Sequence, residues 1–259
     1  MGLILFIISV LPVFLLGMYI YKKDRNKEPT KLLTKLFIGG ILSCFLVLFI
    51  SDIMSSVFPI FSADYLELNM AELVIYVFIG IALVEEFSKW IITYNFSYNE
   101  IEFEEIYDAI VYSVFVSLGF AFFENLLYVY SGGITTGILR AILAVPGHVC
   151  DGVFMGYYFG LAKQSALNNR HDLERKNMIL SIIVPMIMHG IYDYCLLTGN
   201  MLYIIFFFIF IIFVYIFTVK KVKRISSIKK KMKYYDNYCA NCGHIVNSNF
   251  CPICGRENN

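Results

Sequence analysis

Long apolar runs alternate with short polar stretches along the whole chain. The seven runs lie at residues 3–20, 36–58, 71–94, 108–130, 138–163, 178–198 and 201–219. A helix needs about 20 mostly apolar residues to cross the ~30 Å hydrocarbon core of a bilayer. The pattern predicts an all-α polytopic bundle of about seven transmembrane helices, and therefore a multi-pass protein of the cell membrane.

The composition supports a lipid environment. Of the 259 residues, 59% are hydrophobic and only 16% are charged, and the mean hydropathy is +0.69. This is more apolar surface than the core of one soluble domain can bury, so the excess must face lipid. We therefore expect the bilayer to be the main partner of the chain.

Basic residues set the expected orientation. They follow the first run (Lys22, Lys23, Arg25, Lys27), recur in residues 163–177, and form a dense cluster in residues 220–231. Lys and Arg accumulate on the cytoplasmic side of membrane proteins. The N-terminus is therefore expected outside and the C-terminus in the cytosol. Because the last cluster follows a transmembrane run, we interpret it as a membrane flank and expect no nucleic-acid binding.

Several ionisable residues lie inside the apolar runs. They are Asp52, Glu85, Glu86, Lys89, Glu124, His148, Asp151, His189 and Asp193. A charged residue at mid-helix costs about 2.5–3.5 kcal/mol on insertion scales, so such residues normally face the bundle interior and carry function. Asp52 is expected to be a polar residue at a span end. Arg140 and Lys163 are expected to extend to the membrane interface.

Helical spacing places these groups on shared faces. The pairs are Glu85 and Glu86 with Lys89, Glu124 with Tyr128, His148 with Asp151, and His189 with Asp193. Polar faces on four helices predict one common cavity, in which a glutamate acts as general base and histidines stabilise an oxyanion. Each pair alone could equally be a structural ion pair that joins helices.

The order and separation of these residues resemble the motifs of a known family, the PrsW membrane proteases. The matching segments are Val84-Glu85-Glu86-Phe87-Ser88-Lys89, Asp108-Ala109-Ile110-Val111-Tyr112, Phe123-Glu124-Asn125-Leu126-Leu127-Tyr128, Arg140 with Pro146-Gly147-His148 and Gly152, and Met188-His189-Gly190-Ile191-Tyr192-Asp193. The resemblance covers the whole membrane portion. It implies kinship with the CAAX prenyl endopeptidases and the bacterial ABI proteins.

The resemblance also implies an activity. The chain would be an intramembrane endopeptidase that cuts a membrane-protein substrate, and in bacterial members this cut initiates proteolysis of membrane-bound anti-sigma factors during stress responses. Glu85 or Glu86 would activate a water, and His148 and His189 would bind the water or the oxyanion. Asp193 would orient His189, and Glu124 would be a further polar member of the site.

The catalytic metal is left open by the residues. A Glu-His-His set could bind Zn with one open position, but the H-E-x-x-H helix typical of metalloproteases is absent from this sequence. We expect a water activated by glutamate without a metal, with a metal-dependent site as the alternative.

The tail carries a separate motif. Cys239 and Cys242 form one CxxC pair, and Cys251 and Cys254 form a second, each followed by glycine. Four thiolates on two tight turns predict a structural zinc ribbon. The sequence thus predicts a protease domain (1–219), a basic juxtamembrane linker (220–235) and a zinc ribbon (236–259). The ribbon is expected to be a docking module for a cytosolic partner or a regulatory module.

Two functions from other classes use the same residues. The buried polar cluster could bind a ligand in a noncatalytic receptor or scaffold, or it could form the path of an ion-coupled carrier. A carrier is expected to show repeated or paired interrupted helices, and the sequence shows no internal repeat.

Overall fold

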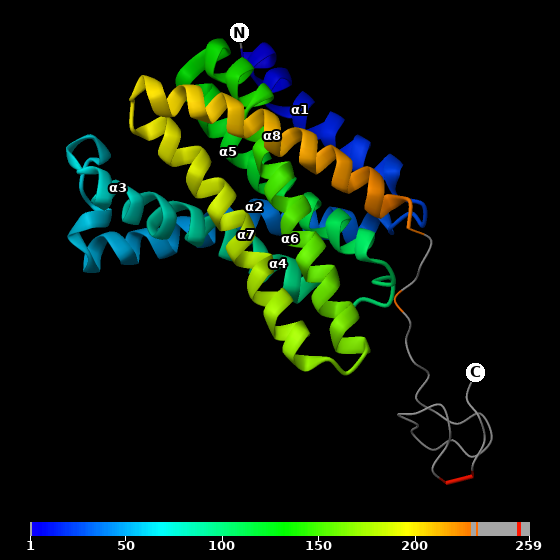
Figure 1. The fold of residues 1–259 in the computed structure, drawn as a ribbon. Helices are drawn as coiled ribbons and strands as arrows, with labels where there is room; N and C mark the ends of the chain where they lie inside the picture. Colours follow the sequence, from blue (N-terminus) through cyan, green and yellow to red (C-terminus); the bar gives the residue numbers. More distant parts are fainter. Residues whose placement is uncertain (1, 229–231, 233–252, 255–259) are drawn as a thin grey trace.

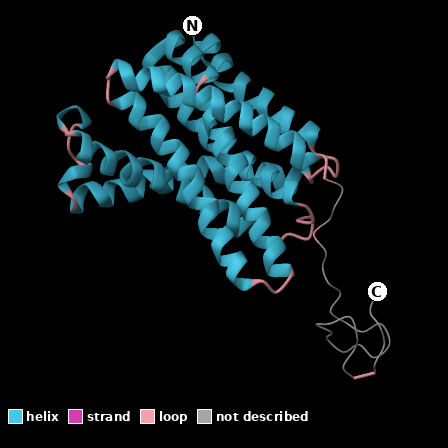
Figure 2. Cartoon of the chain, viewed as in Figure 1, coloured by secondary structure: helices cyan, strands magenta, loops and turns pink. Residues whose placement is uncertain are grey.

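The computed structural model describes residues 2–228, 232 and 253–254, and none of these residues lies in a strand (Figure 2). The helices are α1 (Gly2–Lys23), α2 (Thr30–Val57), α3 (Met70–Ile75), the π-helical segment η3 (Tyr76–Leu83), α4 (Val84–Ser97), α5 (Ile106–Ile142), α6 (Ala144–Leu167), α7 (His171–Leu197) and α8 (Met201–Ser226), with two short 3-10 turns, η1 (Pro59–Phe61) and η2 (Tyr65–Glu67), before α3. The predicted all-α bundle is confirmed.

Five helical stretches of the described chain are long and apolar enough to cross a membrane: α1, α2, α7, α8 and a stretch that joins α5 and α6. The predicted run 71–94 is divided among α3, η3 and α4, which follow one another without a gap. Each predicted run thus coincides with helix. The number of spans and the outside location of the N-terminus remain predictions.

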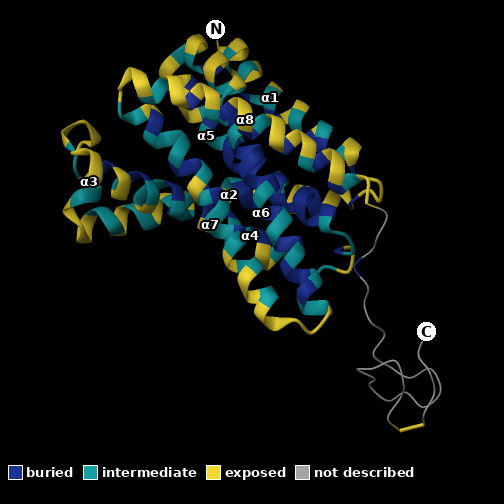
Figure 3. Cartoon of the chain, in the orientation of Figure 1, coloured by how far each residue is buried: buried dark blue, intermediate teal, exposed yellow. Residues whose placement is uncertain are grey.

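The centre of the molecule is formed by α5 and α6 (Figure 1). In the most apolar part of the stretch that joins them, 78% of the residues are buried, compared with 22–28% in the other four stretches. Figure 3 shows the corresponding pattern, with buried residues in the middle and exposed ones on the outer helices. The exposed residues of the outer helices are mostly Leu, Ile and Phe, as expected for surfaces that contact lipid.

Helix α5 contains a break, which lies in the sequence between the apolar runs 108–130 and 138–163. Gly133 has φ of +77°, in the left-handed region that glycine adopts at little cost. The residues beyond Gly133, up to Ile142, therefore leave the axis of the first part of the helix. Arg140 lies in this second part of α5.

Helices α2 and α5 cross at a point where their backbones touch. A Cβ atom at Gly40 would lie 2.0 Å from the carbonyl oxygen of Val116, and a Cβ atom at Gly119 would lie 2.0 Å from that of Phe37. Small residues at such crossings let membrane helices approach closely. This contact fixes α5, and with it one wall of the polar cavity described below.

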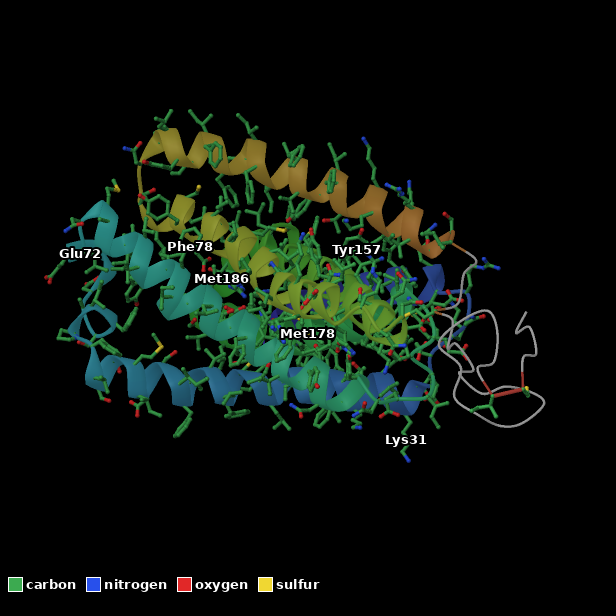
Figure 4. The ribbon with its side chains drawn as sticks, turned by 60° about the horizontal axis from the view of Figure 1, so that its bottom comes forward. Lys31, Glu72, Phe78, Tyr157, Met178 and Met186 are labelled. Atoms are coloured by element: carbon green, nitrogen blue, oxygen red, sulfur yellow. The ribbon has the colours of Figure 1, made fainter. Side chains whose placement is uncertain are left out.

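The two ends of the bundle differ in structure. At one end, α2 and α3 are joined through η1 and η2, and Asn69 and Glu72 form a capping box that starts α3. Glu72 and Lys31 lie at opposite ends of the molecule (Figure 4). At the other end, α8 continues to Ser226 and includes the first residues of the predicted basic linker.

Of the predicted zinc ribbon, residues 236–259, only residues 253 and 254 are among the described residues. Cys239, Cys242 and Cys251 lie outside the described residues, and Cys254 is described as an exposed residue. The ribbon and the division into 1–219, 220–235 and 236–259 therefore remain predictions.

Candidate active site

Four helices bring the ionisable residues of the apolar runs to one place inside the bundle. Glu85, Glu86 and Lys89 come from α4, Glu124 from α5, His148 and Asp151 from α6, and His189 and Asp193 from α7. Glu86 and Lys89 are completely buried, and His148, Asp151 and His189 are buried as well. Asp52 is exposed on α2 and belongs to no part of this group, in agreement with its interpretation as a boundary residue.

Glu86 is held by two positively polarised groups. Its Oε1 atom accepts from Lys89 Nζ at 2.7 Å and from His189 Nδ1 at 2.8 Å. A buried carboxylate is tolerated only when it is paired and hydrogen-bonded. Glu86 is therefore tied to its own helix through Lys89 and to α7 through His189.

His189 is surrounded by carboxylates. Its Nε2 atom lies 3.3 Å from Asp193 Oδ2 and 3.8 Å from Glu85 Oε2, and its Nδ1 atom lies 3.9 Å from Asp151 Oδ2. The predicted contact between His189 and Asp193 is present. Asp151, which the sequence spacing places on the same helix face as His148, also faces His189 across the helix interface.

His148 is held between Glu124 and Lys89. Its Nε2 atom lies 2.8 Å from Glu124 Oε2, and its Nδ1 atom lies 3.3 Å from Lys89 Nζ. An ionised carboxylate can only accept hydrogen bonds and an ammonium can only donate them. The contacts therefore favour the neutral tautomer with the proton on Nε2 and the lone pair on Nδ1.

The expectation that Arg140 extends to the membrane interface is wrong, whereas that for Lys163, whose partner Tyr98 ends α4, stays a prediction. Arg140 turns inward and its Nη2 donates to Glu124 Oε2 at 2.9 Å. Lys163 is buried and donates to the carbonyl oxygen of Tyr98 at 2.7 Å. For Arg140 the reason is that a protein acceptor lies within reach inside the bundle, so its charge does not need interfacial water. The adjacent glycines Gly132 and Gly133 are the sequence signal of the bend that turns Arg140 inward.

The group borders a cavity of about 560 Å³. Its polar wall contains Glu85, Glu124, Arg140, His148, Asp151, His189 and Asp193. Tyr65, Tyr76, Ile81, Tyr128, Leu139, Leu143, Tyr192, Leu196 and Leu197 are among its other lining residues. Glu85 lines the cavity, and its neighbour Glu86 does not. Tyr128 also lines the cavity. The guanidinium of Arg140 lies 4.2 Å from the centre of the Tyr128 ring.

The donor atoms of four residues fit a divalent metal ion in type and spacing. One ligand atom each of Glu86, His148, Asp151 and His189 lies within 4.8 Å of all the others. Carboxylate oxygens and imidazole nitrogens are ligands of Zn and related metals. Glu86 Oε2 is also buried without a hydrogen-bond partner among the described residues. A bound metal ion is one explanation of such a buried polar atom.

The arrangement can move protons and stabilise negative charge. Glu85 offers a carboxylate to the cavity, and its Oε2 atom has no hydrogen-bond partner among the described residues. The imidazole of His189 and the ammonium of Lys89 lie 3.8 and 3.6 Å from that oxygen. A base next to positively polarised donors in a polar cavity is suited to hydrolytic chemistry.

Comparisons with known proteins agree with this chemistry. A family model described as "PrsW family intramembrane metalloprotease" matches residues 28–219. Protease PrsW of Oceanobacillus iheyensis is 38% identical over 73% of this chain and 80% of the relative, and that of Geobacillus kaustophilus is 38% identical over 73% and 78%. Protease PrsW of Bacillus subtilis is 34% identical over 75% and 84%. No solved structure matches the chain.

Proposed function

The chain belongs to the PrsW family of intramembrane proteases, and from this premise we propose that its buried cluster of Glu, Lys, His and Asp hydrolyses a peptide bond of a membrane-bound protein. It is a hydrolase of the cell membrane. The observation that carries the proposal is the convergence of α4, α5, α6 and α7 on one polar cavity. There, a carboxylate oxygen of Glu85 lies 3.8 Å from the imidazole of His189 and has no hydrogen-bond partner among the described residues.

Glu85 is the general base in this proposal. It lines the cavity, whereas Glu86 is fully buried and paired with Lys89 and His189. A base must reach the proton that it removes, so the carboxylate that faces the cavity is the better placed of the two. Glu86 serves to hold Lys89 and His189 in position.

The proposed reaction follows from these positions. Glu85 takes a proton from water, and the water oxygen bonds to the scissile carbonyl carbon while the π electrons move to the carbonyl oxygen. His189, which lines the cavity, stabilises the resulting oxyanion. When the intermediate collapses, the C–N bond breaks and the proton held by Glu85 passes to the amine that leaves. Asp193 positions His189 through the contact at 3.3 Å.

A catalytic metal would be held by Glu86, His148, Asp151 and His189, whose donor atoms fit it. When bound, such an ion supplies Lewis acidity, which polarises a carbonyl and makes a bound water more acidic. The family is described as one of metalloproteases, which supports a metal-dependent form of the reaction. The sequence alone leads us to expect the form without a metal.

The substrate in this proposal is a membrane protein that enters the bundle from the bilayer. The resemblance to the family points to a membrane-bound anti-sigma factor, cut at its first site in regulated proteolysis. The zinc ribbon at Cys239, Cys242, Cys251 and Cys254 is proposed to dock a cytosolic partner.

Co-expression with candidate single-span membrane proteins tests the proposal. Wild-type chain is compared with Glu85→Gln, Glu86→Gln and His189→Ala, and Glu67→Gln serves as the control because Glu67 is an exposed residue outside the cavity. We expect substrate fragments with the wild type and the control only, at equal membrane abundance. Fragments that persist in all variants would point to a binding site, as in a receptor or carrier.

A further inference from the structure

We propose that Arg140 is a positioning residue of the site, which holds the Glu124 carboxylate so that Glu124 fixes the tautomer and orientation of His148. The inference deepens the proposed peptidase function and rests on it for its catalytic consequence. Its structural consequence, the state of the His148 ring, can be measured without a substrate.

Arg140 is held by three contacts of different kinds. Its Nη2 atom donates to Glu124 Oε2 at 2.9 Å and its Nε atom donates to Asn125 Oδ1 at 3.0 Å. Its guanidinium lies 4.2 Å from the centre of the Tyr128 ring. The planar fork of arginine can make two directed hydrogen bonds and stack on a ring at once, which a lysine ammonium cannot.

Asn125, one of the three partners of Arg140, is itself fixed by the fold. Asn125 is fully buried, and its Nδ2 atom donates to the carbonyl oxygen of Ser9 in α1 at 2.9 Å. Arg140 and Glu124 are 16 positions apart in α5, and they meet because α5 is broken at Gly133. The geometry therefore needs the bend and the contact with α1, and these exist only in the folded protein.

Glu124 connects Arg140 to His148. The same oxygen, Oε2, accepts from Arg140 Nη2 at 2.9 Å and from His148 Nε2 at 2.8 Å. A carboxylate bonded to one ring nitrogen keeps the proton on that nitrogen and leaves the lone pair on the other. The lone pair of Nδ1 then faces Lys89, at 3.3 Å. Without the arginine, the Glu124 side chain could rotate away and the ring would lose this constraint.

Two other roles are consistent with the same contacts and must be separated from this one. Arg140 and Glu124 could be an ion pair that only joins parts of α5. Glu124 could also react with the substrate directly, in which case Arg140 would matter little to His148. Only the proposed role changes the tautomer of His148 when Arg140 is replaced.

The test is a nitrogen NMR spectrum of the full-length chain in membranes, labelled with 15N in histidine. The chain has four histidines, and loss of one ring signal in His148→Gln assigns His148. We expect the wild type to show a single tautomer protonated at Nε2. Arg140→Gln and Glu124→Gln should both give a mixture of ring states, and Arg140→Lys should give an intermediate spectrum. Arg175→Gln is the matched control, because Arg175 is exposed on α7, and it should reproduce the wild-type spectrum.

Kinetics supply the second readout once a substrate is cleaved. We expect Arg140→Gln to lower kcat about 10- to 100-fold, as is usual when a group that orients a metal-binding histidine is removed, because His148 is one of the four proposed metal ligands. KM should stay within about twofold of the wild type. Arg140→Gln combined with Glu124→Gln should be no worse than Glu124→Gln alone, since both act through one contact.

The outcomes separate the proposals. An unchanged His148 tautomer in both Arg140→Gln and Arg140→Lys, at wild-type helix content, overturns the positioning role. A changed tautomer with no substrate cleaved by any variant supports the positioning role and counts against the peptidase function. If Arg140→Gln fails to fold, Arg140→Lys, which keeps the charge but not the fork, decides the question.

Discussion

Glu85 and Glu86 are neighbours in the sequence and yet lie in different environments. One helical step of about 100° turns Glu86 toward Lys89 and His189, while Glu85 faces the cavity. Glu86 and Lys89 have no exposed side-chain area. Removal of one member of such a buried pair leaves the other charge uncompensated and costs about 3–5 kcal/mol. The two glutamates should therefore respond differently to the same substitution.

We predict that Glu85→Gln abolishes cleavage with little effect on stability, whereas Glu86→Gln lowers both. Loss of a general base costs about 10²- to 10⁴-fold in rate. Thermal unfolding of the purified variants in one detergent, together with the cleavage assay, checks this. Equal losses of stability in the two variants would contradict the assignment of roles.

Glu28 is a buried acid outside the apolar runs, in the connection between α1 and α2. Burial raises the pKa of Glu28 to about 8, although the hydrogen bond donated by the Tyr112 hydroxyl at 2.6 Å partly lowers it. Its ordinary value is 4.5, and one unit of difference corresponds to about 1.4 kcal/mol. Because the pKa is raised on folding, the stabilising contribution is complete below pH 4.5 and is lost as the pH rises through about 8.

The corresponding prediction is a pH-dependent melting temperature. The melting temperature of the wild type should fall between pH 4.5 and 8 more steeply than that of Glu28→Gln, because the glutamine at position 28 does not ionise. Parallel curves for the two proteins would show that Glu28 does not titrate in this range.

At the scale of elements, the segment before the glutamate pair is unusual. Residues Tyr76–Leu83 form a π-helical segment, and such segments occur frequently at functional sites. Phe78 of this segment lies against α7 (Figure 4), where a Cβ atom on Gly190 would be 2.5 Å from its ring. Gly190 directly follows His189, so this contact sets how closely the histidine approaches α4.

We predict that Gly190→Val destabilises the protein by about 1–3 kcal/mol through overpacking and strongly reduces cleavage by displacing His189. Adding Phe78→Ala should restore part of both, because it removes the ring that the new side chain meets. Gly2→Val is the control, since nothing lies within 4 Å of a Cβ atom there. An additive double variant would contradict the proposed contact.

At the scale of the whole molecule, two metal sites are proposed in different parts of the chain. One lies within the bundle, at Glu86, His148, Asp151 and His189. The other is the predicted cysteine ribbon of the tail, whose four thiolates would leave no open position. Their separation along the chain allows each to be removed independently.

We predict that the purified wild-type chain loses cleavage on treatment with a strong chelator and regains it with added Zn. Metal analysis should show less bound zinc in Glu86→Gln and also in the double variant Cys239→Ser with Cys242→Ser. In the cleavage assay with added Zn, only Glu86→Gln should be inactive. Cleavage by fully metal-depleted protein would instead support the metal-free mechanism expected from the sequence.

The sequence by itself determined the elements and most of the polar residues that meet in the cavity, Arg140 excepted. Apolar runs of membrane length dictate helices, because the bilayer offers no partner for unpaired backbone groups. The cost of burying charge indicates that Glu85, Glu86, Lys89 and His189 face inward. These conclusions depend only on local spacing and composition, so one chain suffices to reach them.

The tertiary structure alone decided which of these groups meet. It turned Arg140 inward through the bend at Gly133, brought Asp151 of α6 to 3.9 Å from His189 of α7, and separated Glu85 from Glu86 by their exposure to the cavity. Such contacts join residues far apart in the chain, and they depend on helix crossings and on one left-handed glycine. Helical periodicity specifies the face on which a residue lies, but only packing specifies what faces it.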